Sequence, residues 1–171
     1  MSTRCQIEFT SSWENDKKEK QTESILVYRH SDGYPEGVIP DLKNFLKWLG
    51  RRIEDVEYTS ACFIYWSKRN YEERIYNTEY GGGKYKNGKN KKWSVPQDFN
   101  SILLIGLGIC EKDCFHGDIE YFYNVITDLT VSRGMFGKAK TEIKCFKVPF
   151  KEGDEKLTKK DFKLIKTIKI K

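Results

Sequence analysis

The sequence has few of the residues and segments on which several protein classes depend. Its 171 residues include only two histidines and four prolines. The longest apolar run, Ile102–Cys110, covers nine residues, whereas a membrane-spanning helix needs about 20. No apolar segment follows the charged start Met1–Gln6, so we expect no secretion signal. These absences predict a soluble protein of the cytoplasm that has no membrane partner.

The cysteines are few and odd in number, which argues against a framework of disulfides. Five are present, at positions 5, 62, 110, 114 and 145. In a protein without a secretion signal, reduced thiols are the default. The chain is 38% hydrophobic and 14% aromatic, a composition that excludes a largely disordered protein. Its length suits one domain, residues 1–171, with a core of its own.

Hydrophobic periodicity predicts both strands and helices. Alternating or continuous apolar patterns indicate strands, and apolar stripes at helical spacing indicate helices. The predicted strands are 3–10, 24–30, 102–109, 117–126 and 141–148, with a final edge strand within 161–171; the predicted helices are 38–49 and 58–76. The 102–109 segment is apolar on both faces and is predicted as a buried central strand. We therefore expect a single α+β domain whose mainly antiparallel sheet of five or six strands carries two helices on one face.

One stretch, residues 28–37 (YRHSDGYPEG), connects a predicted strand to the clearest helix of the sequence. Asp32 and Gly33 are typical of a turn, since Gly accepts a positive φ and Asp bonds its own backbone. The helical stripe of 38–49 follows, and Gly50 suits its C-terminal end. The stretch also holds one of the two histidines.

Both histidines belong to a His-x-Asp pattern. His30 precedes Asp32 by two positions, and His116 has the same relation to Asp118. In an extended strand such residues project from the same face, and Glu120 continues that face after Asp118. If the two segments are neighbours, these five side chains are candidate catalytic residues for general acid–base chemistry or ligands of an unspecified divalent metal. The alternative is structural, with carboxylates that hold turns and histidines that donate to them.

A second possible ligand group, Cys110-x-x-x-Cys114-x-His116, is close to this pattern in the sequence. Its spacing fits no standard zinc motif. If the two histidines were more than about 15 Å apart, a shared site would fail, because reacting groups must meet at one centre.

A long basic loop is predicted at 77–100, and we expect it to be mobile. Its middle is rich in lysine, contains no acid and has two aromatic residues. Lysines bind a phosphate backbone, and aromatic rings stack on bases. The candidate nucleic-acid-binding residues are Lys84, Tyr85, Lys86, Lys89, Lys91, Lys92 and Trp93. The alternative is a solvated hairpin tip or a disordered insertion.

Three short motifs together resemble a family of small uncharacterised proteins from bacteria, archaea and their viruses. They are Ser2-Thr3-Arg4, the Tyr-Arg-His-x-Asp-Gly-Tyr-Pro segment at 28–35 and Gly-Asp-Ile-Glu-Tyr at 117–121. The resemblance covers about a quarter of the chain. It implies a prokaryotic or viral origin, with the host cytoplasm as the location for a viral protein, and no activity.

Two classes of function remain open on the sequence. The leading hypothesis is a binding or accessory protein that contacts nucleic acid or a protein partner through the basic loop. The alternative is a small hydrolase, metal-dependent or acid–base, that uses the paired His-x-Asp motifs. The sequence specifies no cofactor and no oligomeric state.

Overall fold

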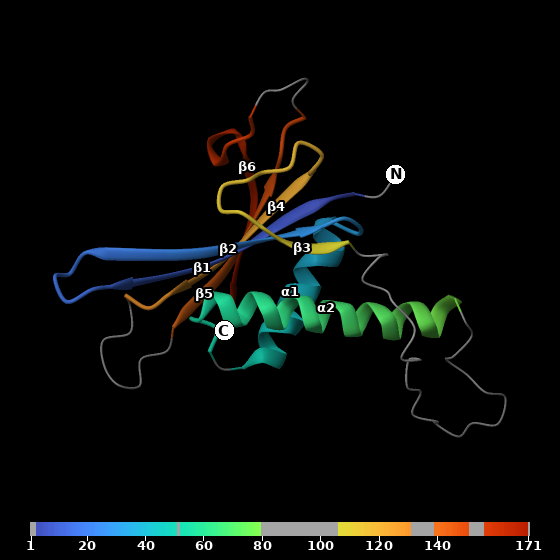
Figure 1. The fold of residues 1–171 in the computed structure, drawn as a ribbon, viewed down its shortest axis with the longest axis horizontal. Coiled ribbons are helices and arrows are strands. Elements are labelled where there is room, and N and C mark those ends of the chain that lie inside the picture. The colour runs from blue at the N-terminus through green and yellow to red at the C-terminus, as the bar shows by residue number, and fades with distance from the viewer. Residues whose placement is uncertain (1–2, 51, 80–105, 131–138, 151–155, 171) are drawn as a thin grey trace.

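The structure, a computed structural model, describes residues 3–50, 52–79, 106–130, 139–150 and 156–170 (Figure 1). Side chains are described throughout these ranges except in 71–79, where only the backbone is. The described residues contain one six-stranded sheet, two α-helices and a short 3-10 helix. The elements are β1 (Cys5–Glu14), β2 (Lys20–Arg29), α1 (Pro35–Leu49), α2 (Val56–Glu79), β3 (Leu107–Cys110), β4 (Tyr121–Asp128), β5 (Lys140–Lys147), η1 (Lys159–Asp161) and β6 (Lys163–Ile170).

The sheet has the strand order β3-β2-β1-β4-β5-β6. β1 pairs antiparallel with β2 and parallel with β4, whereas the remaining neighbours are antiparallel. Both helices fall between β2 and β3 in the chain. The predicted α+β class, the mainly antiparallel sheet and the two helices after the second strand are confirmed. Because β4 returns to the middle of the sheet, residues more than a hundred positions apart lie on adjacent strands.

One face of the sheet packs against the two helices. Cys5, Ile7 and Phe9 alternate along β1 and belong to a cluster that includes residues of α1 and α2. The ring of Phe9 lies 6.1 Å from that of Phe45 in α1 and 5.3 Å from that of Phe63 in α2. Burial of such large apolar side chains contributes about 1.5–3 kcal/mol each. The helix layer therefore follows from the period-two pattern of the strands and the stripe of α1.

The other face of the sheet is covered in part by loops. Leu26 of β2 and Phe122 of β4 point to this side and pack with residues of the 111–120 and 148–162 segments. The buried members of this cluster are Leu26, Ile119, Phe122, Val148, Leu157 and Phe162, and Tyr28, Cys110, Phe115 and Phe146 are partly buried against it.

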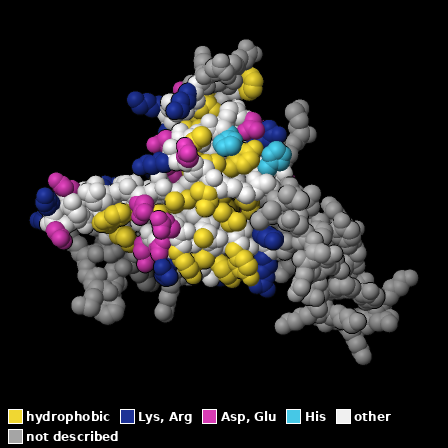
Figure 2. Space-filling view, viewed as in Figure 1, with side chains coloured by type: hydrophobic (Ala, Val, Ile, Leu, Met, Phe, Trp, Pro, Cys, Tyr) yellow, Lys and Arg dark blue, Asp and Glu magenta, His cyan; other side chains and the backbone are white. Residues whose placement is uncertain are grey.

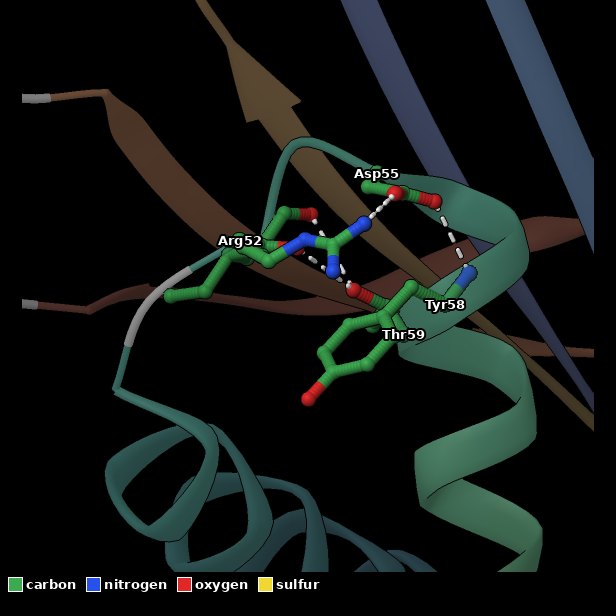
Figure 3. Close-up of polar contacts among 5 residues, drawn as sticks. Arg52, Asp55, Tyr58 and Thr59 are labelled. Carbon is green, nitrogen blue, oxygen red and sulfur yellow. Dashed lines mark hydrogen bonds and ion pairs between the residues drawn. The ribbon is translucent and has the colours of Figure 1, made fainter.

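The junction of the two helices is held by a capping network (Figure 3). The Asp55 carboxylate accepts a hydrogen bond from the backbone N–H of Tyr58 at 2.9 Å and pairs with the Arg52 guanidinium at 2.6 Å. The Thr59 hydroxyl donates to the Arg52 carbonyl at 3.2 Å, and the guanidinium lies 4.3 Å from the centre of the Tyr58 ring. Asp55 thus supplies the N-cap that the first turn of α2 needs.

The segment after β2 depends on the backbone conformation of Asp32 and on the small size of Gly33. Asp32 has a φ of 55°, in the left-handed region. A Cβ on Gly33 would lie 2.8 Å from the carbonyl carbon of Arg4, so no larger residue fits against β1. The Gly33 N–H donates to the Thr3 carbonyl at 2.9 Å, and the Tyr123 hydroxyl donates to the Gly33 carbonyl at 2.8 Å. The turn is therefore tied to both central strands.

An ion pair between buried Arg29 and the partly exposed Asp41 fixes α1 to β2. Arg29 is 3% exposed, and its guanidinium contacts the Asp41 carboxylate at 3.0 Å and the Ser31 carbonyl at 2.9 Å.

α1 begins three residues earlier than predicted, at Pro35, where a missing N–H costs no hydrogen bond. Neither α1 nor α2, in its described residues, carries an apolar stretch that could cross a membrane.

The prediction of a buried central strand at 102–109 is wrong for its described part. β3 begins at Leu107, lies at the edge of the sheet beside β2, and leaves Ile109 63% exposed. Apolar residues on both faces suggested burial on both faces, but β3 pairs with β2 at the edge of the described sheet. It begins directly after Gly106, whose φ is 58°. Residues 102–105 are outside the described ones.

Two further boundaries differ from the sequence patterns. β4 begins at Tyr121 rather than at 117, because Gly117 and Asp118 form a turn and Glu120 a bend before the strand. In α2, Phe63 is fully buried and Ile64 is only partly buried, whereas helical spacing in the sequence predicts Ile64, Tyr71 and Ile75 as the inward residues. The side chains of Tyr71 and Ile75 lie outside the described ones.

Candidate functional site

The structure brings both histidines to one tyrosine, Tyr28. The Tyr28 ring stacks on the His116 imidazole with centroids 4.4 Å apart and planes at 20°. Its other ring neighbour is His30, at 6.2 Å. Because both imidazoles adjoin the same phenol, their separation falls inside the limit of about 15 Å that a shared site requires. Figure 2 shows both histidines, in cyan, on one face of the molecule with hydrophobic side chains between them. We call Arg4, Tyr28, His30, Cys110, His116 and Asp118 the histidine cluster.

The direction of β2 places the side chains of Tyr28 and His30 on the same face of the sheet. Side chains alternate along a strand, and Leu26 and Tyr28 both belong to the loop-covered face. His30 follows with the same spacing, immediately after β2 ends at Arg29. A Cβ on Gly106 would lie 2.6 Å from the His30 Cβ. Backbone packing against this glycine therefore positions His30.

The Tyr28 hydroxyl connects His30 to Asp118. Its oxygen lies 3.3 Å from His30 Nδ1 and 3.4 Å from Asp118 Oδ2. A phenol has one proton to donate, so in the tautomer with a proton on Nδ1 the imidazole donates to the phenol and the phenol donates to the carboxylate. Burial and the nearby Asp118 charge raise the pKa of Tyr28, which keeps the phenol protonated. The three groups form a hydrogen-bonded chain.

Arg4 holds the carboxylate end of this chain. Its Nη1 lies 2.8 Å from Asp118 Oδ2, the same oxygen that accepts from Tyr28. Both side chains are more than a third exposed, so the pair contributes at most about 1 kcal/mol to stability. Its main consequence is geometric, since it fixes the orientation of Asp118 in front of the phenol.

Buried Gln6 fixes the loop that carries His116. Its side-chain amide donates to the Cys114 carbonyl at 3.0 Å, and its oxygen accepts the backbone N–H of His116 at 3.1 Å. The same amide lies 3.4 Å from Cys110 Sγ. Gln6 is fully buried in β1, so the central strand of the sheet determines where this exposed loop lies.

Cys110 is the thiol nearest to an imidazole in the cluster. Its Sγ lies 3.6 Å from His116 Nε2. Burial raises the pKa of Cys110, although the hydrogen bond from Gln6 opposes that effect. A thiol with a raised pKa is a poor nucleophile at neutral pH, so we assign Cys110 a positioning role beside His116.

Glu120 pairs with a residue outside the histidine cluster, and the strand geometry expected for Asp32 is absent. β2 ends at Arg29 and Asp32 has left-handed backbone, so the argument from alternation no longer places Asp32 beside His30. Glu120 pairs with Lys147 at 3.4 Å, and the Lys147 ammonium lies 4.2 Å from the centre of the Tyr121 ring. Of the five predicted residues, His30, His116 and Asp118 meet at Tyr28.

The described residues offer no ready metal site. Among them, no group of three His, Cys, Asp or Glu side chains is arranged to hold an ion. This applies to Cys110, Cys114 and His116 as well, the second ligand group that the sequence suggested. The seven predicted nucleic-acid-binding residues of the basic loop, from Lys84 to Trp93, lie outside the described residues, and their role stays a prediction.

The sequence did not predict that Arg4 and Tyr28 belong to the histidine cluster, or that Gln6 holds the loop of His116. The alternation of Leu26, Tyr28 and His30 placed Tyr28 beside the histidine, but no sequence signal paired it with His116. Comparison of the chain with models of protein families, with curated proteins and with solved structures finds no match.

Proposed function

We propose that the protein is an acid–base hydrolase in which His30 and His116 supply the base and the acid. The observation that supports this best is the contact of both imidazoles with Tyr28. Two imidazoles that adjoin one phenol are a suitable pair for proton transfer near neutral pH. The absence of a ready metal-ligand group in the described residues favours this version over the metal-dependent one.

The hydrogen-bonded chain gives the two histidines different roles. His30 takes a proton from the attacking water or hydroxyl, because Tyr28 and Asp118 stabilise the imidazolium that results. His116 gives its proton to the leaving oxygen. The attacking oxygen bonds to the reacting centre as the bond to the leaving group breaks, and exchange with water resets both histidines.

Phosphodiesters are the substrate class that this proposal names. Their cleavage needs one base and one acid and produces an alkoxide leaving group that His116 can protonate. Arg4 supplies a cation at the cluster, about a third exposed, although Asp118 shares its charge. The site lies on a surface of the molecule (Figure 2), where a polymer has access.

The test is cleavage of bis(4-nitrophenyl) phosphate and of a fluorescent single-stranded RNA by the full chain treated with a chelator. The variants His30→Asn and His116→Gln each keep an amide nitrogen near the position of one imidazole nitrogen of the histidine they replace. On the RNA each should reduce kcat/KM at least about 100-fold, the lower end of what positioned acids and bases contribute. On bis(4-nitrophenyl) phosphate, whose nitrophenolate leaves without a proton, only His30→Asn should do so. Glu120→Gln, whose carboxylate pairs with Lys147, is the matched control and should stay within about two-fold.

Folding of each variant is verified by circular dichroism and thermal unfolding. A bell-shaped pH profile that loses one limb in each histidine variant would support the proposal. No cleavage of either substrate, cleavage only after metal is added, or full activity in both histidine variants would overturn it.

A further inference from the structure

A second surface lies on the helix layer, away from the histidine cluster. A cavity of about 220 Å³ opens between the end of α1 and the middle of α2. Its lining consists of Trp48, Tyr65, Trp66, Arg69 and Asn70, which we call the aromatic pocket. We propose that the aromatic pocket binds the base of a nucleotide or of a single nucleic-acid strand. This proposal does not depend on the hydrolase proposal.

The first argument is the exposure of large aromatic side chains. Trp48 is 51% exposed and Tyr65 is 57% exposed. Scattered exposed aromatics are normal, but two that share a cavity with a third indicate a binding surface. Aromatic faces of this kind stack on bases whatever the sequence of the strand.

The second argument is that the pocket walls are held in place from below. The core residue Phe45 lies 6.2 Å from the Trp48 ring and 5.8 Å from the Trp66 ring. Trp66 is itself partly buried against the main core. The two indoles therefore have support before any ligand arrives, so little conformational entropy is lost when a ring stacks on them.

The third argument is charge. Among the described residues that line the aromatic pocket, Arg69 is a cation and none is acidic. Lys47 precedes Trp48 in the sequence of α1. An aromatic surface with a cation at its side suits a planar ring that carries a phosphate. It is less suited to an uncharged apolar peptide.

The fourth argument is size and polarity. Pockets for drug-sized molecules usually enclose about 300–1,000 Å³, so a cavity of about 220 Å³ accommodates one ring system. Asn70 adds an amide, which has both donors and an acceptor for the edge of a base. The lining thus combines ring faces with one group that can read a base edge.

The experiment follows intrinsic tryptophan fluorescence of the full chain on titration with three probes. These are adenosine 5′-monophosphate, a single-stranded deoxyadenylate decamer and a blunt duplex of the same length. Quenching by the mononucleotide and the decamer alike assigns a nucleotide site, and quenching by the decamer alone assigns a strand site. Either result supports the proposal, and stacking predicts that the duplex binds more weakly because its bases are paired.

Trp48→Leu and Tyr65→Leu are the test variants, read by fluorescence anisotropy of a labelled decamer or nucleotide. Each should weaken binding about ten-fold or more, as expected when one stacked base loses its partner. Tyr58→Leu removes another exposed aromatic of α2 outside the pocket and is the matched control, expected within about two-fold. His30→Asn should bind like the wild type, which separates this proposal from the hydrolase proposal.

Four outcomes would overturn the inference. They are no binding of any probe, equal loss in Tyr58→Leu and the two test variants, unchanged binding in both test variants, and stronger binding of the duplex than of the decamer. Saturable binding of a tryptophan-containing peptide in place of the nucleotide probes would assign the pocket to a protein partner and would also overturn it.

Discussion

The phenol of Tyr28 stacks on the imidazole of His116 at a centroid distance of 4.4 Å, while its hydroxyl reaches Asp118 at 3.4 Å. The ring and the hydroxyl of one side chain therefore act on different partners. The ring supports His116 from one side, and the hydroxyl joins Asp118 to His30. A substitution can remove one of these functions and keep the other.

Tyr28→Phe keeps the stacked ring and removes the hydroxyl. We expect a fall in kcat/KM of about five- to ten-fold, the factor that corresponds to one ordinary hydrogen bond, with little change in Tm. Tyr28→Leu removes the stack as well and should cause a larger loss. Steady-state kinetics on bis(4-nitrophenyl) phosphate measure both, and Tyr58→Phe is the control. Wild-type rates in Tyr28→Phe would contradict the role of the hydrogen-bonded chain.

Gly106→Ala should displace His30. The new Cβ would lie 2.6 Å from the His30 Cβ, and the φ of 58° is unfavourable for alanine. We expect a loss of about 1–3 kcal/mol in the free energy of unfolding, together with reduced activity. Urea unfolding and kinetics measure the two effects. Gly108→Ala, where no atom lies within 4 Å, is the control, and equal stability of the two variants would contradict the prediction.

Gly33→Ala should destabilise the junction between the turn and β1. The added methyl group would meet backbone atoms of Arg4 and Cys5 at 2.8 and 3.0 Å, and backbone moves less readily than a side chain. A loss of about 1–3 kcal/mol is expected. The denaturation midpoint in urea tests it against Gly117→Ala, which meets nothing within 4 Å and should remain close to the wild type.

Stability should fall at alkaline pH because of a buried thiol. Burial raises the pKa of Cys5 from 9.0 to about 12. Below pH 9 the thiol is protonated in both the folded and the unfolded chain. Between pH 9 and about 12 only the unfolded chain releases the proton, so the free energy of unfolding decreases, by about 1 kcal/mol at pH 10.

Urea unfolding at pH 8 and pH 10 under reducing conditions measures this decrease. Cys145, whose pKa is raised to about 11 by burial, adds to it. Cys5→Ala should reduce the difference between the two pH values, whereas Cys114→Ala, which removes an exposed thiol, should keep it. An unchanged pH dependence in Cys5→Ala would show that other groups cause the loss.

The sequence by itself determined the local elements, because their signals are periodic and lie within short windows. The alternation at Cys5, Ile7 and Phe9 and the stripe of α1 predicted structure correctly. After β2 the left-handed residue is Asp32 rather than the expected Gly33. The prediction failed at 102–109, where local hydrophobicity suggested a central strand. Whether a strand lies at the edge or in the centre depends on its partners, which a short window does not contain.

Only the tertiary structure decided the histidine cluster. Tyr28 and Asp118 are 90 positions apart, and they meet because β1 pairs with β2 on one side and with β4 on the other. The sequence showed two similar His-x-Asp patterns but not that a tyrosine joins them. It also gave no sign that Trp48 and Tyr65 share a cavity, since side chains on different helices become neighbours only when the helices pack. Long-range pairing and packing, rather than local propensity, place these groups together.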